Sequence, residues 1–297
     1  MTASWHEQIF FNQAVKRLES LVAHPPMFVA TTIPDDEQSQ ADEQYHDGEA
    51  DRYDSYSQTP RIAVAERWIL SWISRTIPNG VIVDLGCGTG RIARQLADTN
   101  RRVIAIDRSQ QMLAQAGAAL PADTTALLRC DARMVPVADG SVDAVVCSGV
   151  LHHIPDWPAA IQEMSRILRP GGTMIVREPN AEYPEALFAP VERAIATMAR
   201  IASRHQRPAQ VGELDQFQPS PVEQPIVLAE VSKQATQYGL RPTWEGSAKF
   251  FASLGIPDAV PLQRLYFEVA NLVDRAIMNS IGLRRGSLAI GVYTKSI

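Results

Sequence analysis

The 297-residue sequence predicts an α/β fold built on a doubly wound parallel sheet. Three observations lead to this prediction. Five short apolar or β-branched runs are followed or separated by helical patterns, and a glycine-rich stretch joins the first run to the first of these helices. The runs are VIVDL (81–85), RVIAI (102–106), TALLR (125–129), VDAVVC (142–147) and TMIVR (173–177), and the helical patterns cover 90–98, 109–119 and 157–168. Nearly continuous apolar strands that alternate with helices are typical of a parallel sheet covered on both faces.

Composition excludes several other classes of protein. With 45% apolar and 21% charged residues the chain is globular, and its net charge of -5 argues against broad binding to a phosphate backbone. No apolar run approaches the roughly 18 residues of a membrane span, and the N-terminus does not resemble a signal peptide. Three cysteines without zinc-site spacing predict neither a disulfide framework nor a metal site. We therefore expect a soluble, cytoplasmic protein.

The remaining elements flank this core. Residues 5–22 and 61–76 have helical periodicity. Residues 35–54 hold nine acidic residues and one arginine, which predicts a solvated loop, although Tyr45, Tyr53 and Tyr56 favour the alternative of an active-site cover. Beyond Pro179 we expect a helix over 185–204, a proline-rich loop over 207–225, a helix over 226–238, a strand over 241–250, an apolar helix over 259–281 and a strand over 287–295. The predicted organisation is an N-terminal helix and cover segment (1–60), a core (61–180), a helical lid insertion (181–225) and the rest of the core sheet (226–297) with a helical insertion over 252–285.

The glycine-rich stretch predicts a ligand site at the carboxyl ends of the strands. Gly86, Gly88 and Gly90 allow positive φ angles and close approach of a ligand to the backbone. Their spacing is one residue shorter than the dinucleotide fingerprint, and no Lys-Ser or Lys-Thr pair follows, so phosphate is the weaker interpretation. Asp107, 21 residues after Gly86, could accept ribose hydroxyls. Asp131, at the end of the next strand, is either a turn residue or a partner for an adenine amino group.

Four motifs in this order resemble class I S-adenosylmethionine-dependent methyltransferases, in particular the ubiquinone/menaquinone C-methyltransferase branch. They are VDLGCGTG, IAID, CDARMVPVADGSVDAVVCSGVLHHIPD and ILRPGGTMIV, and the resemblance covers about residues 60–180. It implies a Rossmann-like seven-stranded sheet of order 3-2-1-4-5-7-6 whose seventh strand is antiparallel. The implied cofactor is S-adenosylmethionine, which becomes S-adenosylhomocysteine.

The resemblance also implies roles for individual residues. The cofactor-binding set is Asp84, Gly86, Cys87, Gly88 and Gly90 at the methionine part, Asp107 and Arg108 at the ribose, Asp131 and Ala132 at the adenine, and Cys147 and Ser148 at the methyl-donor end, together with Met112. His152, or else His153, would be a general base, with Glu178 orienting the imidazole. The alternative is that neither histidine is a base and that one of them only caps or packs.

The acceptor is predicted to be a small, hydrophobic or aromatic molecule, with O-, N- and C-methylation unresolved. Its candidate contacts are Tyr53, Tyr56, Arg177 and Asn180, although the last two could be ordinary surface residues. The apolar stripes of the added helices could line the acceptor pocket, pack on the sheet or form a homodimer interface. Two other functions stay open: a methyltransferase acting on tRNA, other RNA or protein, and a non-catalytic binding module. The acidic composition makes nucleic acid the less favoured partner.

Overall fold

The computed structural model describes the core of the chain and parts of its additions. The described residues are 29–30, 36–57, 67, 70–77, 79–98, 100–183, 220–224, 226–248, 268–269, 272 and 286–297. The predicted helices over 5–22 and 185–204, half of the one over 61–76 and most of the one over 259–281 lie outside them. Among the described helices, none has the length and apolarity needed to cross a membrane.

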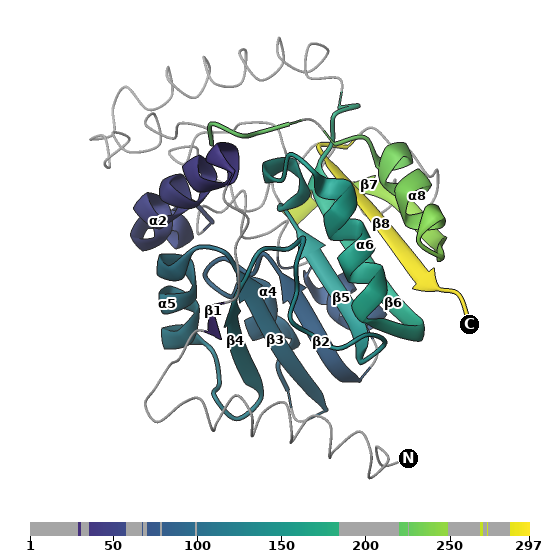
Figure 1. Cartoon of the computed structure of the whole chain (residues 1–297), viewed down its shortest axis with the longest axis horizontal. Helices are drawn as coiled ribbons and strands as arrows, with labels where there is room; N and C mark the ends of the chain where they lie inside the picture. Colours follow the sequence, from purple (N-terminus) through teal and green to yellow (C-terminus); the bar gives the residue numbers. More distant parts are fainter. Residues whose placement is uncertain are drawn as a thin grey trace.

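The core is an eight-stranded sheet in the order β1-β4-β3-β2-β5-β6-β8-β7 (Figure 1). The strands are β1 (Val29–Ala30), β2 (Gly80–Leu85), β3 (Arg101–Asp107), β4 (Thr125–Arg129), β5 (Val142–Ser148), β6 (Leu168–Pro179), β7 (Leu240–Ala248) and β8 (Leu288–Lys295). Without the two-residue edge strand β1, which the sequence did not predict, this is the order 3-2-1-4-5-7-6. Among these described strands β8 is antiparallel to both of its neighbours, β6 and β7, and every other pair is parallel. The predicted fold class is confirmed.

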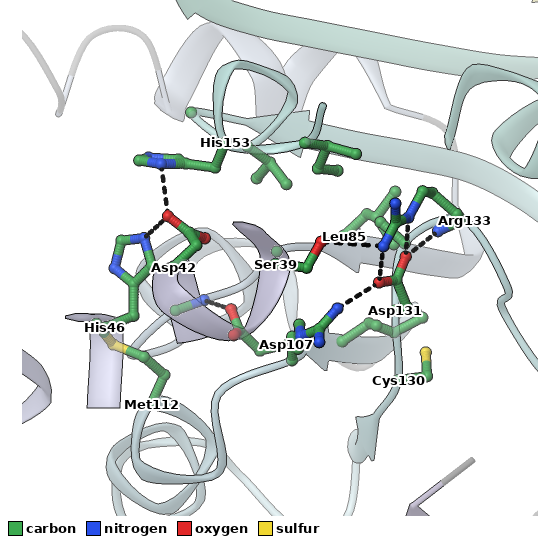
Figure 2. A pocket seen from close by; sticks show the side chains of 18 of the residues that line it. Ser39, Asp42, His46, Leu85, Asp107, Met112, Cys130, Asp131, Arg133 and His153 are labelled. Carbon is green, nitrogen blue, oxygen red and sulfur yellow. Dashed lines mark hydrogen bonds and ion pairs between the residues drawn. The ribbon is translucent and has the colours of Figure 1, made fainter. Parts of the chain in front are cut away.

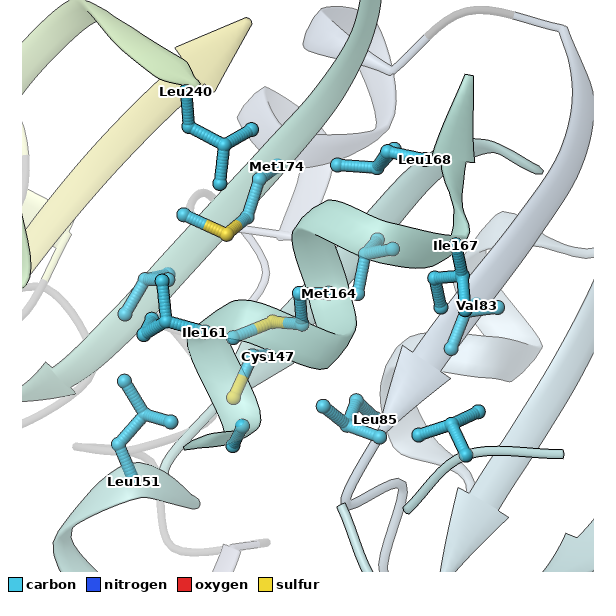
Figure 3. Packing of buried hydrophobic residues seen from close by; sticks show 14 of the residues in the cluster. Val83, Leu85, Cys147, Leu151, Ile161, Met164, Ile167, Leu168, Met174 and Leu240 are labelled. Atoms are coloured by element: carbon cyan, nitrogen blue, oxygen red, sulfur yellow. The ribbon is translucent and has the colours of Figure 1, made fainter. Parts of the chain in front are cut away.

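Helices cover both faces of the sheet. They are α4 (Arg91–Leu96), α5 (Gln110–Ala119), the 3₁₀ turn η1 (Leu151–His153), α6 (Trp157–Ile167) and α8 (Leu228–Gln237). On one face, Ile161 and Met164 of α6 pack with Cys147 and Met174 of the sheet (Figure 3). On the other face, side chains of α4 and α5 are buried in a second apolar cluster with the sheet. Two buried clusters explain why the central strands are apolar along their whole length.

The acidic segment is a helix, so the predicted solvated loop was wrong. Residues Glu37–Ser57 form α2, which contributes side chains to the wall of a pocket. Carboxylates hold this helix on arginines of the core. Glu43 pairs with Arg108 at 2.8 Å and with Arg129 at 2.5 Å, and Asp36 pairs with Arg133 at 2.8 Å. The sequence pattern missed this helix because charge pairing with distant residues, and not an apolar stripe, holds it in place.

We expect the Glu43→Gln variant to loosen α2 and leave the core unchanged. Glu43 accepts from both Arg108 and Arg129, and hydrogen bonds to charged groups are stronger than neutral ones. Amide hydrogen exchange in α2 should therefore speed up by roughly 5–30-fold, equivalent to about 1–2 kcal/mol. Glu37→Gln, which alters an exposed carboxylate of the same helix, is the matched control. Equal exchange in the two variants would contradict this account.

Candidate cofactor and active site

The turn after β2 has the backbone geometry that its glycines predict. Gly86, Gly88 and Gly90 have φ angles of 71°, 53° and 81°. A Cβ atom on Gly86 would overlap the Val150 side chain. Asp84, the penultimate residue of β2, is 1% exposed, and its Oδ2 accepts from the Ala93 amide at 2.9 Å. Burial raises the pKa of Asp84 to about 7. The hydrogen bond from Ala93 ties α4 to the end of β2 inside the protein.

Asp107, at the end of β3, has acceptor capacity left for a ligand. Its Oδ2 accepts from the Gly88 amide at 2.8 Å and its Oδ1 from the Ser109 amide at 2.9 Å. A carboxylate offers about four lone-pair sites, so these two bonds do not saturate it. Burial raises the pKa of Asp107, while the backbone hydrogen bonds oppose that rise. Asp107 can therefore accept further hydrogen bonds from ligand hydroxyl groups at the end of β3.

The Asp131 carboxylate already accepts hydrogen bonds from two arginines, which the sequence did not indicate. Its Oδ1 accepts from Arg133 N and Nε at 2.8 and 2.9 Å. Its Oδ2 accepts from Arg133 Nη2 at 2.8 Å and from Arg108 Nη1 at 2.7 Å. Burial opposes ionisation, but these bonds and charges lower the pKa of Asp131. Four donors fill the four lone-pair sites, so an adenine amine could bind here only if one arginine moved away.

A pocket lies between these strand ends and α2, and Figure 2 shows its wall. Of the predicted residues, those that line it are Tyr53, Gly86, Gly88, Asp107, Arg108, Met112, Asp131, Ala132 and His153. Those that do not are Asp84, Cys87, Gly90, Cys147, Ser148, His152, Arg177, Glu178 and Asn180. The side chain of Tyr56 lies outside the described residues. Lining residues that sequence reasoning missed include Ser39, Asp42 and His46 of α2, Cys130 and Arg133.

Several of the predicted site residues do not line the pocket and are buried or hydrogen-bonded within the fold. The Asn180 amide donates to the Gly286 carbonyl at 2.7 Å, which ties the end of β6 to the segment before β8. The thiols of Cys87, Cys130 and Cys147 are buried, and burial raises the pKa of each, so they are neutral. Ser148 differs, because its Oγ is buried and has no hydrogen-bond partner among the described residues.

The predicted pairing of His152 with Glu178 is present. His152 Nδ1 lies 2.7 Å from Glu178 Oε2, and Glu178 is 1% exposed. Glu178 Oε1 accepts from the amides of Val150 and Leu151, each at 3.0 Å. These two amides fix the carboxylate, and the carboxylate in turn fixes the imidazole. His152 follows Gly149 and Val150, which line the pocket, so the pair lies beside the pocket wall.

Comparison with known proteins adds the family. Residues 83–176, which hold the glycine turn and the ends of β3, β4 and β5, match the family model described as a methyltransferase domain. Residues 83–176 thus resemble a methyltransferase domain, as the sequence motifs predicted. Over 115 residues the chain is 36% identical to a demethylmenaquinone methyltransferase of Beutenbergia cavernae, covering 39% of this chain and 45% of that one. Over 119 residues it is 38% identical to an uncharacterised 37.1 kDa transposon protein of Streptomyces fradiae, covering 36% and 34%.

The methyltransferase domain also has the fold of solved relatives. An S-adenosylmethionine-dependent methyltransferase of Thermotoga maritima superposes with a TM-score of 0.55 at 16% identity, over 88% of this chain and 100% of that one. The two curated relatives align over less than half of their own lengths.

S-adenosylmethionine is the cofactor of this class, and the residues present fit it. The unsaturated carboxylate of Asp107 suits a ribose, and the glycine turn leaves backbone open at Gly88, where a Cβ would meet nothing closer than Tyr53 at 3.9 Å. The Ser148 Oγ at the end of β5 has no hydrogen-bond partner among the described residues and could bond to a ligand. Binding of an adenine amine at Asp131 would require Arg108 or Arg133 to move away from that carboxylate.

Proposed function

We propose that this chain transfers a methyl group from S-adenosylmethionine to a small hydrophobic or aromatic acceptor, with His152 as the general base. The observation that carries the proposal is the pairing of His152 with the buried Glu178, beside a pocket that also holds Asp107 and the glycine turn. When bound, the cofactor supplies a methyl group already activated by a sulfonium. The protein then has to bind and align the two molecules and remove a proton from the acceptor.

Each group has a distinct task in this proposal. Asp107 holds the ribose, and the turn at Gly86 and Gly88 lets the cofactor approach the backbone. Glu178 accepts from His152 Nδ1, which leaves Nε2 as the basic nitrogen and stabilises the imidazolium after proton transfer. The predicted roles of Asp84 and Cys87 become indirect, because both side chains are buried away from the pocket lining.

A small acceptor suits the charges and the surface near the dyad. Val150 and Ile154 supply apolar surface to the pocket near His152. The pocket arginines Arg108 and Arg133, with Arg129 close by, are all ion-paired to carboxylates, which weakens their attraction for nucleic-acid phosphates. A relative is named for demethylmenaquinone, and we extend to this chain only the class of small acceptor.

Calorimetry with S-adenosylmethionine tests the cofactor half of the proposal. We expect one site per chain, and a 10–100-fold loss of affinity in Asp107→Asn, because a charge-assisted hydrogen bond contributes about 1.5–3 kcal/mol. Asp123→Asn, at an exposed position after α5, is the matched control. Absence of binding at millimolar cofactor would rule out an enzyme. Binding without methyl transfer to any acceptor of a broad aromatic and aliphatic panel would favour the non-catalytic module.

A further inference from the structure

Three pocket side chains that the methyl-transfer proposal does not use meet in one place. Asp42 and His46 are one turn apart on α2, and His153 is the last residue of η1. Asp42 Oδ1 lies 3.5 Å from His46 Nε2 and 3.0 Å from His153 Nδ1. Figure 2 shows the Asp42 carboxylate between the two imidazoles. The three side chains can present one ligand atom each within 4.8 Å of one another.

These separations match those of metal ligands. In a tetrahedral site with metal–ligand bonds of 2.0–2.1 Å, neighbouring ligand atoms are roughly 3.3 Å apart. The two distances measured from Asp42 Oδ1 lie on either side of that value, and the two imidazole nitrogens lie within 4.8 Å of each other. Two imidazoles and a carboxylate favour a transition metal such as Zn²⁺ over Mg²⁺ or Ca²⁺, which prefer oxygen ligands.

The three side chains are already grouped around one carboxylate oxygen. His153 Nδ1 is buried and faces Asp42, whose Oδ1 lies 3.0 Å away. The same oxygen lies 3.5 Å from His46 Nε2, so two imidazoles share one carboxylate oxygen. A cation placed between Asp42 and the two imidazoles would contact all three side chains.

Neighbouring groups support the same site. Ser220 Oγ donates to Asp42 Oδ1 at 2.5 Å, the kind of outer contact that orients a ligating carboxylate. Glu223, His152 and His153 form a second group whose ligand atoms lie within 4.8 Å of one another. Glu223 therefore lies close to both histidines of η1. Groups from α2, η1 and residues 220–223 all converge on this point.

We propose that Asp42, His46 and His153 bind a divalent transition-metal ion that fastens α2 to η1 over the pocket. The expectation of no metal site rested on cysteine spacing and could not foresee this one, because His153 is more than a hundred residues from Asp42 and His46 along the chain. The ion would bind whether or not the chain transfers methyl groups. Its test is therefore separate from the test of cofactor binding.

Metal content and cobalt spectra of the full chain test the site. The protein is stripped with a chelator, loaded with Zn²⁺ or Co²⁺ and dialysed. We expect one ion per chain and the visible absorption of Co²⁺ in a low-symmetry site with nitrogen ligands. His46→Gln and His153→Gln, which keep polar side chains, should each weaken binding at least tenfold. Asp51→Asn, on the same helix but paired with Gln115, should bind as the wild type does.

Circular dichroism and calorimetry with S-adenosylmethionine accompany each variant, so that loss of metal is separated from loss of fold or of the cofactor site. If one variant does not fold, the other histidine variant decides. The proposal is overturned if the wild type retains no ion, or if both histidine variants bind Co²⁺ with unchanged affinity and spectrum. Wild-type metal binding without cofactor binding would leave this site standing and remove the proposed function.

Discussion

Gly86→Ala should destabilise the protein by about 2–5 kcal/mol and abolish binding of S-adenosylmethionine. Two costs add at this position. A φ of 71° places an alanine in the left-handed region, at a cost of about 1–2 kcal/mol. Its Cβ would also overlap the Val150 side chain, and such overpacking costs about 1–3 kcal/mol. Relief of the overlap requires the Val150 side chain or the backbone of the turn to move, and both line the pocket in which we propose the cofactor binds.

Gly239→Ala separates the two costs. Gly239 has a φ of 78°, close to that of Gly86, but a Cβ there would meet nothing within 4 Å. Urea unfolding of both variants therefore isolates the overlap with Val150, and calorimetry measures its effect on the cofactor. If Gly86→Ala is no less stable than Gly239→Ala and still binds S-adenosylmethionine, the close packing of this turn has no functional role.

The strands were predictable because their signal is local. TALLR coincides with β4, and β2, β3 and β5 differ from their predicted runs by one residue at one or both ends. The exception is β6, which begins at Leu168 and not at Thr173. Its first residues include Pro170 and two glycines, which are typical of a turn. A register irregularity between Val142 and Ala144 of β5 accommodates this early start.

Helix α2 and the ion pairs that hold it were not predictable from local sequence patterns. Nothing near Glu43 in the sequence indicates that Arg108 and Arg129 neutralise it, since the pairs are 65 and 86 residues apart. The same is true of His46, whose ring contacts that of His153 in η1, more than a hundred residues away. The family resemblance predicted that Asp131 contacts the adenine of the cofactor. It did not indicate that Arg133, only two residues away, already donates hydrogen bonds to that carboxylate.

The pair of His152 and Glu178 was predictable, because both follow neighbouring parallel strands, β5 and β6, at the same edge of the sheet. Adjacent parallel strands end at the same edge of the sheet, so residues that directly follow them lie close together. Asn180 shows the limit of that argument. It lies only two residues beyond Glu178, yet its side chain holds the Gly286 carbonyl and does not line the pocket.

Glu178→Gln should reduce methyl transfer by about 10²–10⁴-fold while the fold and the affinity for the cofactor stay close to wild type. The reason is the tautomer of His152. The amides of Val150 and Leu151 both donate to one oxygen of Glu178, so they will hold the carbonyl oxygen of a glutamine on their side. The amide nitrogen then faces His152 Nδ1 and donates to it. This puts the imidazole proton on Nε2, which can no longer accept one.

The double variant gives the decisive measurement. If His152 and Glu178 act as one unit, His152→Gln, Glu178→Gln and the two together will have similar rates, since the losses within one catalytic unit do not add. Glu182→Gln, at an exposed position just beyond β6, should leave the rate unchanged. Turnover of His152→Gln within a few fold of wild type would remove the general-base role. Additive losses in the double variant would instead mean that Glu178 acts through the backbone of Val150 and Leu151, by shaping the pocket wall, and not through the imidazole.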